Sequence, residues 1–174
     1  QWDRALTQLS VAGELDDAAM LEVAAQILEG LAHAHRHGIV HRDVKPTNVL
    51  VADTSEISVK LLDFGLAQFA EAETLTAAGD VPGTLAYISP ERLAGDEASF
   101  GADVWAVGVV LWEALAGYHP FWASSPIETA RRIEVGPPPL ESVRPDLPRQ
   151  LTDAVGRATA VDPARRPSAV QLAD

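Results

Sequence analysis

One stretch of the chain gathers residue types that can assist phosphoryl transfer. It reads His41-Arg42-Asp43-Val44-Lys45-Pro46-Thr47-Asn48, and Asp63-Phe64-Gly65 begins fifteen positions after Asn48. Transfer of a phosphoryl group from a metal-bound nucleotide needs a group that orients the attacking hydroxyl, a cation for the developing charge, and oxygen ligands for magnesium. The two acids, the lysine and the amide of these runs could supply that set.

The elements that must position these side chains can be predicted from apolar spacing and capping residues. Asp16 can cap a helix whose apolar positions continue to a natural stop at Gly38, and a shorter helix ends near Gly13. Residues 49–51 and 59–62 have the composition of two short strands around a polar turn. The two runs that could do chemistry therefore lie before and after a small β-hairpin.

Downstream of these runs the chain is expected to be helical. Residues 102–116 are almost wholly apolar, but the run is shorter than a membrane span and includes Asp103 and Glu113, which favours a helix buried in a protein core. Residues 151–160 have amphipathic spacing, and Ser168 can cap a final helix. The fold class expected from these patterns is mainly α.

Length, composition and charge exclude several functional classes. The chain has 174 residues, of which 47% are apolar, so it can form one domain with a sizeable core. A formal net charge of −12 argues against binding to nucleic acid, because the surface repels phosphate backbones. Cysteine is absent, which removes disulfides and thiolate chemistry and fits a reducing cytoplasm. We find neither a signal peptide nor a membrane segment.

Five motifs occur in the order found in protein kinases. They are the runs at 41–48 and 63–65, the segment Gly83-Thr84-Leu85-Ala86-Tyr87-Ile88-Ser89-Pro90-Glu91, Asp103 at the start of the apolar helix, and residues 162–167. The chain resembles the C-terminal lobe of a bacterial eukaryotic-like serine/threonine protein kinase over nearly its whole length. This resemblance implies an α+β family fold, a helical bundle with a short β-hairpin under the active site, with residues 1–174 forming the C-terminal lobe only.

The resemblance also implies roles for the residues that could do chemistry. Asp43 would orient a substrate hydroxyl and accept its proton, and Lys45 would contact the γ-phosphate of ATP. Asn48 and Asp63 would hold Mg²⁺ or Mn²⁺ against the phosphates. A single Asp or Asn in a loop is more often a turn or cap residue, and it is the combination of four at this spacing that favours the catalytic interpretation.

Regulation is expected to involve the acidic loop at residues 70–80. In kinases of this type, the arginine at the position of Arg42 can pair with a phosphorylated activation loop. Thr74 and Thr76 lie in the corresponding acidic loop, and we expect one of them to be phosphorylated in the parent enzyme. Thr84 would form a hydrogen bond near Asp43 and Lys45.

Six further residues are expected to support the site rather than to react. His41 would pack under Phe64, next to Gly65, and Asp103 would bind the backbone of the catalytic loop. Glu91 and Arg166 would form a buried ion pair. Separately, the histidines at 33, 35 and 37 could suggest a metal site, but the sequence shows no acid or thiol near them, so packing is the favoured interpretation.

The sequence also departs from a complete kinase domain. It contains no Gly-x-Gly-x-x-Gly run and no strand lysine ahead of the catalytic loop. We therefore expect a fragment truncated at both ends, nearly inactive alone, whose parent supplies the N-terminal lobe, phosphorylates Ser or Thr of proteins, and acts in the cytoplasm with or without a membrane anchor. Two alternatives stay open: a catalytically silent kinase-like binding module, and a small-molecule phosphotransferase of the same fold.

Overall fold

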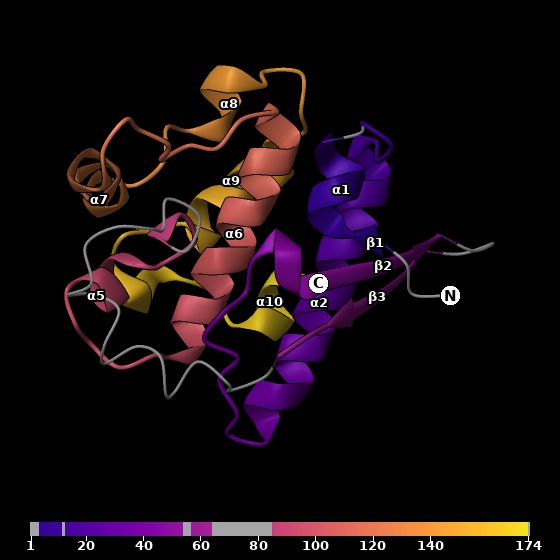
Figure 1. The fold of residues 1–174 in the computed structure, drawn as a ribbon, viewed down its shortest axis with the longest axis horizontal. Helices are drawn as coiled ribbons and strands as arrows, with labels where there is room; N and C mark the ends of the chain where they lie inside the picture. Colours follow the sequence, from indigo (N-terminus) through magenta and orange to yellow (C-terminus); the bar gives the residue numbers. More distant parts are fainter. Residues whose placement is uncertain (1–3, 12, 54–56, 64–84, 174) are drawn as a thin grey trace.

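The computed structural model describes residues 4–11, 13–53, 57–63 and 85–173. Helices pack around a long central helix, and a small sheet lies beside the N-terminal part of the chain (Figure 1). In chain order the elements are β1 (Arg4–Ala5), α1 (Leu6–Val11), α2 (Asp17–Arg36), the 3-10 helix η1 (Pro46–Asn48), β2 (Val49–Asp53), β3 (Ile57–Leu61), α5 (Pro90–Leu93), α6 (Phe100–Ala116), α7 (Pro126–Val135), α8 (Leu140–Val143), α9 (Arg149–Ala158), η3 (Pro163–Arg165) and α10 (Ala169–Ala173).

Helix α2 forms as its capping and apolar spacing predict. The Asp16 carboxylate accepts a hydrogen bond from Ala19 N at 2.8 Å, which satisfies one of the amides left free in the first turn. Most apolar positions from Met20 to Leu31 are buried along one face of the helix, whereas Leu21 is exposed. Gly38, with φ of 73°, then takes the left-handed conformation that lets the chain turn away toward the candidate site.

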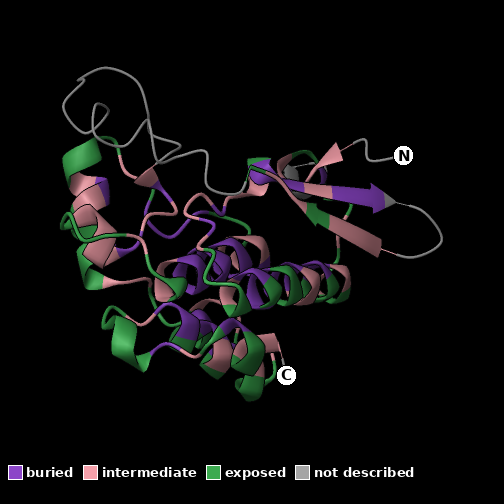
Figure 2. Cartoon of the chain, turned by 90° about the horizontal axis from the view of Figure 1, so that it is seen from below, coloured by how far each residue is buried: buried purple, intermediate pink, exposed green. Residues whose placement is uncertain are grey.

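Helix α6 is the buried core helix that the apolar run predicts. Ser99 caps its first turn, and eleven of its residues are buried, including Trp105 and Trp112. Within the part of the chain that the structure describes, no helix is both long and apolar enough to cross a membrane. Buried residues lie where the long helices face one another and along β2, as Figure 2 shows in purple. The core therefore sits directly beneath the loops that follow α2.

The sheet has three antiparallel strands in the order β1-β2-β3. The predicted hairpin is present, with Val51 opposite Val59, but the sequence analysis expected only two strands. The third, β1, pairs Arg4 with Val51 and Ala5 with Leu50. A two-residue strand is too short to show an alternating pattern, which explains why it was missed.

The side chain of Gln26, from α2, pairs with the outer edge of β3. Its Nε2 donates to Ile57 O at 2.9 Å, and its Oε1 accepts from Val59 N at 2.9 Å. The amide thus takes the place of a neighbouring strand and fixes the hairpin on the long helix. Because β2 follows η1 directly, this contact also fixes where the candidate site sits relative to the core.

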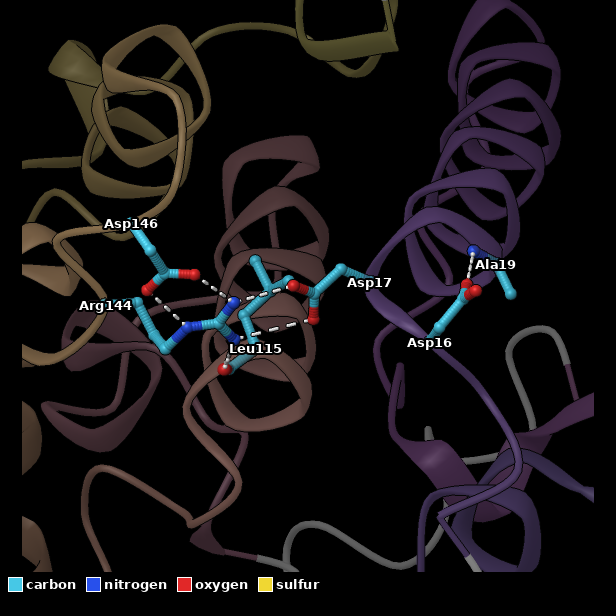
Figure 3. A network of polar contacts seen from close by, with 6 residues as sticks. All are labelled: Asp16, Asp17, Ala19, Leu115, Arg144 and Asp146. Carbon is cyan, nitrogen blue, oxygen red and sulfur yellow. Dashed lines mark hydrogen bonds and ion pairs between the residues drawn. The ribbon is translucent and has the colours of Figure 1, made fainter.

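Arg144 makes a second polar connection, which joins three segments of the helical body (Figure 3). The guanidinium of Arg144 donates to Leu115 O at 2.6 Å, to Asp17 Oδ2 at 2.7 Å and to Asp146 Oδ1 at 2.8 Å. These partners belong to the end of α6, the start of α2 and the loop after α8. The hydrogen bonds from Arg144 lower the pKa of the Asp146 carboxyl, so the pair of Arg144 with Asp146 persists in mild acid.

Candidate active site

The backbone after α2 is held in an unusual conformation by one buried carboxylate. Asp103, in the first turn of α6, accepts from His41 N through Oδ2 and from Arg42 N through Oδ1, both at 2.9 Å. Arg42 has φ of 77°, a left-handed conformation that non-glycine residues rarely adopt. The tie between Asp103 and this loop, predicted from the sequence, is therefore confirmed.

His41 connects this loop to the strand that precedes Asp63. Its side chain is fully buried, and Nε2 lies 2.8 Å from Leu62 O while Nδ1 accepts from Asp43 N at 3.2 Å. A carbonyl can only accept, so the ring carries its hydrogen on Nε2. Burial lowers the pKa of His41 and keeps it neutral, which suits a structural role better than acid–base chemistry.

Asp43, Lys45 and Asn48 form one contact group. Lys45 Nζ lies 2.7 Å from Asp43 Oδ2, and Asn48 Nδ2 donates to both Asp43 O and Asp43 Oδ2 at 2.8 Å. The Asp43 and Lys45 side chains are about a third and a quarter exposed, respectively, whereas Asn48 is buried. The group thus presents a carboxylate and an ammonium to solvent over a fixed amide.

Asp63 reaches the same neighbourhood through the backbone. Leu62 N donates to Asn48 O at 2.8 Å, which places the residue before Asp63 against the end of η1. Asp63 itself has φ of 60° and an exposed side chain. The charges of both Asp43 and Asp63 reach the His41 ring, where they oppose the lowering of its pKa by burial.

Asn48 and Asp63 have the chemistry to bind a divalent cation weakly. Both hydrogen bonds of the Asn48 side chain use its nitrogen, so its carbonyl oxygen is turned away from Asp43. Magnesium commonly binds through one or two carboxylates while water and phosphate oxygens complete its shell. Among the residues that the structure describes, no group of three or more His, Cys, Asp or Glu forms a closed metal site. An open pair of oxygen ligands, the Asn48 amide and the Asp63 carboxylate, agrees with the magnesium pattern.

The predicted ion pair between Glu91 and Arg166 is present. Arg166 Nη1 and Nη2 donate to the two Glu91 oxygens at 2.6 and 2.8 Å, and the guanidinium lies 5.0 Å from the Trp105 ring centre. Burial opposes the Glu91 charge, but the hydrogen bonds and charge of Arg166 outweigh it, so the pKa of Glu91 is lowered. The pair fixes α5 on the core.

Several predicted residues lie outside the described part of the chain. These are Phe64, Gly65, Thr74, Thr76 and Thr84. Their expected roles in packing under the loop, in phosphorylation and in hydrogen bonding stay predictions.

Two contacts at the site were not anticipated. His35 lies 2.9 Å from Asp103 Oδ2, so the expectation that no acid lies near the three histidines was wrong for this one. Tyr87 donates to Glu113 Oε2 at 2.5 Å, and burial raises the pKa of both groups. Partners so distant in sequence carry no local signal, although an acid within an otherwise apolar helix suggests a buried partner, because charged side chains are rarely buried unless they are paired.

Comparison with known proteins shows the family. The model of the protein kinase domain family matches residues 3–174, and the chain belongs to that family. It is 41% identical over 155 residues to serine/threonine-protein kinase PknL of Mycobacterium tuberculosis, and 39% identical over 155 residues to PknA of the same species. It is 36% identical over 155 residues to serine/threonine-protein kinase PrkC of Bacillus subtilis.

Each of these alignments covers 88% of this chain but a smaller part of the relative. The chain spans 38% of the length of PknL, 35% of PknA and 24% of PrkC.

Proposed function

We propose that residues 1–174 form the C-terminal lobe of a serine/threonine protein kinase domain. The parent protein would transfer the γ-phosphate of ATP to Ser or Thr hydroxyls of protein substrates. The contact group of Asp43, Lys45 and Asn48 is the observation that carries this proposal, because it unites a proton acceptor, a cation and a metal-binding oxygen. The helical body, the small sheet and the family membership support it.

Each residue of the group has a role in this proposal. Asp43 accepts a hydrogen bond from the substrate hydroxyl and takes its proton late in transfer, while the neighbouring ammonium of Lys45 stabilises charge on the transferred phosphoryl group. Asn48 and Asp63 hold the divalent cation. When bound, Mg²⁺ neutralises phosphate charge and aligns the triphosphate. The remaining nucleotide contacts come from the parent's other lobe.

The substrate class is inferred from the chain and its relatives together. Lysine two positions after Asp43 is the arrangement found in serine/threonine-directed kinases that this chain resembles, and the similar proteins are named as such kinases. A cytoplasmic site of action accords with the use of ATP and with the absence of cysteine.

Phosphate transfer by the parent protein tests the proposal. Asp43→Asn keeps the side-chain shape but removes the proton acceptor, so kcat should fall by about 10²–10⁴-fold. The KM for ATP should change much less. Radiolabelled ATP and a generic basic protein as acceptor provide the readout.

Asp153→Asn is the matched control, because Asp153 is an exposed residue of α9 and should leave the rate unchanged. Equal rates for the parent and its Asp43→Asn form would rule out the assigned role. Transfer to a small metabolite but not to protein would instead favour the phosphotransferase alternative.

A further inference from the structure

We propose that His33 and His37, at the C-terminal end of α2, bind a divalent transition-metal ion such as Zn²⁺. Two imidazole nitrogens would hold the ion, and water molecules would complete its shell. This site is separate from the candidate active site, and it does not depend on the proposed function.

These two rings are the histidine side chains that solvent reaches most easily. All five histidines of the chain lie in the described ranges. His41 and His119 are buried, and the side chain of His35 is only 10% exposed. His33 and His37 are exposed. A metal ion that prefers imidazole therefore meets this pair first.

The spacing of the pair suits chelation of one ion. Residues four positions apart on a helix share a face, with their Cβ atoms about 5–6 Å apart. The ring centroids of His33 and His37 are 4.7 Å apart, and the ring planes are inclined by 39°. Since Zn–N bonds are about 2.0–2.1 Å long, a single ion beside both rings can contact a nitrogen of each. Binding then requires rotation of the side chains but no change in the backbone.

One hydrogen bond already prepares His37 for a metal ion. Its Nδ1 lies 2.9 Å from His33 O, and a carbonyl only accepts, so Nδ1 carries the hydrogen. The lone pair of the neutral ring is then on Nε2. Histidines that bind metals commonly donate their other ring hydrogen to a backbone carbonyl or a carboxylate, which fixes the tautomer and makes the ligand more basic. Among the residues that the structure describes, the His33 ring has no hydrogen-bond partner, so it can turn toward the same ion.

The chemistry of the pair selects the class of ion. Imidazole suits zinc, copper and nickel, whereas magnesium prefers carboxylate, carbonyl and water oxygens. The chain has no cysteine, so no thiolate competes for zinc. No group of three or more His, Cys, Asp or Glu in the described ranges could hold a metal ion, which leaves the pair as a two-ligand site. Zinc at this site and magnesium at the candidate active site should therefore not compete.

A bound ion would stabilise the last turn of α2. His37 is the C-cap of this helix, and its backbone N–H donates to Ala34 O at 2.9 Å. The chain turns away at Gly38, directly after it. An ion that joins positions 33 and 37 spans the same turn and opposes fraying of the helix end. Because the unfolded chain does not hold the two rings together, binding favours the folded state.

A zinc titration followed by NMR of the histidine rings tests the site. The chain is used without a histidine tag, so that no added imidazole competes. We expect the signals of His33 and His37 to shift together with one midpoint, while those of His35, His41 and His119 stay nearly constant. Magnesium in about tenfold excess over zinc should leave the midpoint unchanged.

Two substitutions each remove one ligand. Loss of an outer contact of a metal site typically lowers affinity about 10–100-fold, so loss of a ligand should cost at least about tenfold in either His33→Gln or His37→Gln. Asp153→Asn is the control for binding to surface carboxylates. Asp153 is exposed on α9, and its substitution should leave the midpoint unchanged.

Separate midpoints for the two rings would overturn the proposal, because they would show that each imidazole binds alone. A midpoint that neither His33→Gln nor His37→Gln changes would overturn it too. If His37→Gln unwinds the end of α2, as judged by circular dichroism, His33→Gln decides, since His33 lies within the helix and is exposed.

Thermal unfolding provides a second measurement. Saturating zinc should raise the Tm of the original chain, and this rise should be lost in His33→Gln. An equal rise in both proteins would mean that zinc binds elsewhere and would contradict the proposal. Neither measurement involves phosphate transfer, so failure of the proposed kinase function would leave both results unaffected.

Discussion

Two residues of the candidate site adopt backbone conformations that cost energy. Arg42 and Asp63 have φ of 77° and 60°, and they are the only non-glycine residues with positive φ in the described ranges. Each such residue costs about 1–3 kcal/mol, and strain of this kind persists only where surrounding contacts impose it. Asp103 imposes it at Arg42, and the contact of Leu62 with Asn48 limits the chain at Asp63. Strain directly before Asp43 and at Asp63 itself supports a functional role for these two carboxylates.

The buried side chain of His119 should make the free energy of unfolding depend on pH. Burial lowers its pKa from 6.5 to about 4 in the folded protein, where its ring packs edge-on against Tyr87. The unfolded chain therefore binds this proton first as the pH falls. The free energy of unfolding should decrease between about pH 6.5 and pH 4, by an amount on the order of 3 kcal/mol.

Denaturant unfolding at a series of pH values measures this effect. His119→Gln cannot bind the proton, so its stability should fall less steeply over the same range, whatever its stability at neutral pH. Parallel pH dependences for the original and the variant protein would show that His119 is not the group responsible.

At the scale of the elements, α6 and α9 pack closely where Gly108 faces the end of α9. A β-carbon built on Gly108 would lie 2.8 Å from Thr159 Cγ2 and 2.9 Å from Ala158 Cβ. Such contacts cannot be relieved without moving one helix or its end. Gly108→Ala should therefore lower the free energy of unfolding by about 1–3 kcal/mol, despite the better helix propensity of alanine.

Gly30→Ala is the matched substitution in α2, where a β-carbon would meet nothing within 4 Å. It should raise the free energy of unfolding by about 0.4–1 kcal/mol, because alanine restricts the unfolded chain and favours helix. Urea unfolding of both variants provides the comparison. Stabilisation by both changes would mean that α6 and α9 are not packed as closely as described.

The two long helices and the hairpin could be predicted because their signals are local. Asp16 marks the start of α2, and the apolar run of α6 is too polar at Asp103 and Glu113 for a membrane. Helix α7 was missed even though Ser125 and Pro126 form a standard helix start. Contacts such as His35 with Asp103, 68 positions apart, have no periodic signature and appear only when the chain folds.

The residues of the candidate site could be predicted from the sequence, but the orientation of its loop could not. Spacing and family resemblance together indicated Asp43, Lys45 and Asn48, and the fold brings these three into direct contact. The supports Asp103 and Arg166 were also anticipated. The sequence could not show how the loop is oriented, because that depends on the contacts of the buried Asp103 carboxylate.

At the scale of the whole molecule, both the net negative charge and the candidate site attract cations. A formal charge of −12 draws divalent ions to many surface carboxylates, so weak metal binding alone would prove little. What distinguishes the candidate site is that the proposed cation ligands, Asn48 and Asp63, lie on two loops joined by the hydrogen bond from Leu62 N to Asn48 O. The central claim is that these loops form one preferred cation site.

Paramagnetic broadening of NMR signals by Mn²⁺ tests this claim most directly. In a titration of this chain, the amides of residues 43–45, 47–48 and 61–63 should broaden at the lowest Mn²⁺ concentrations. Asp63→Asn should raise the concentration needed by about tenfold, whereas Asp153→Asn should not change it. Broadening that begins elsewhere on the acidic surface, or that is unaffected by Asp63→Asn, would contradict the account.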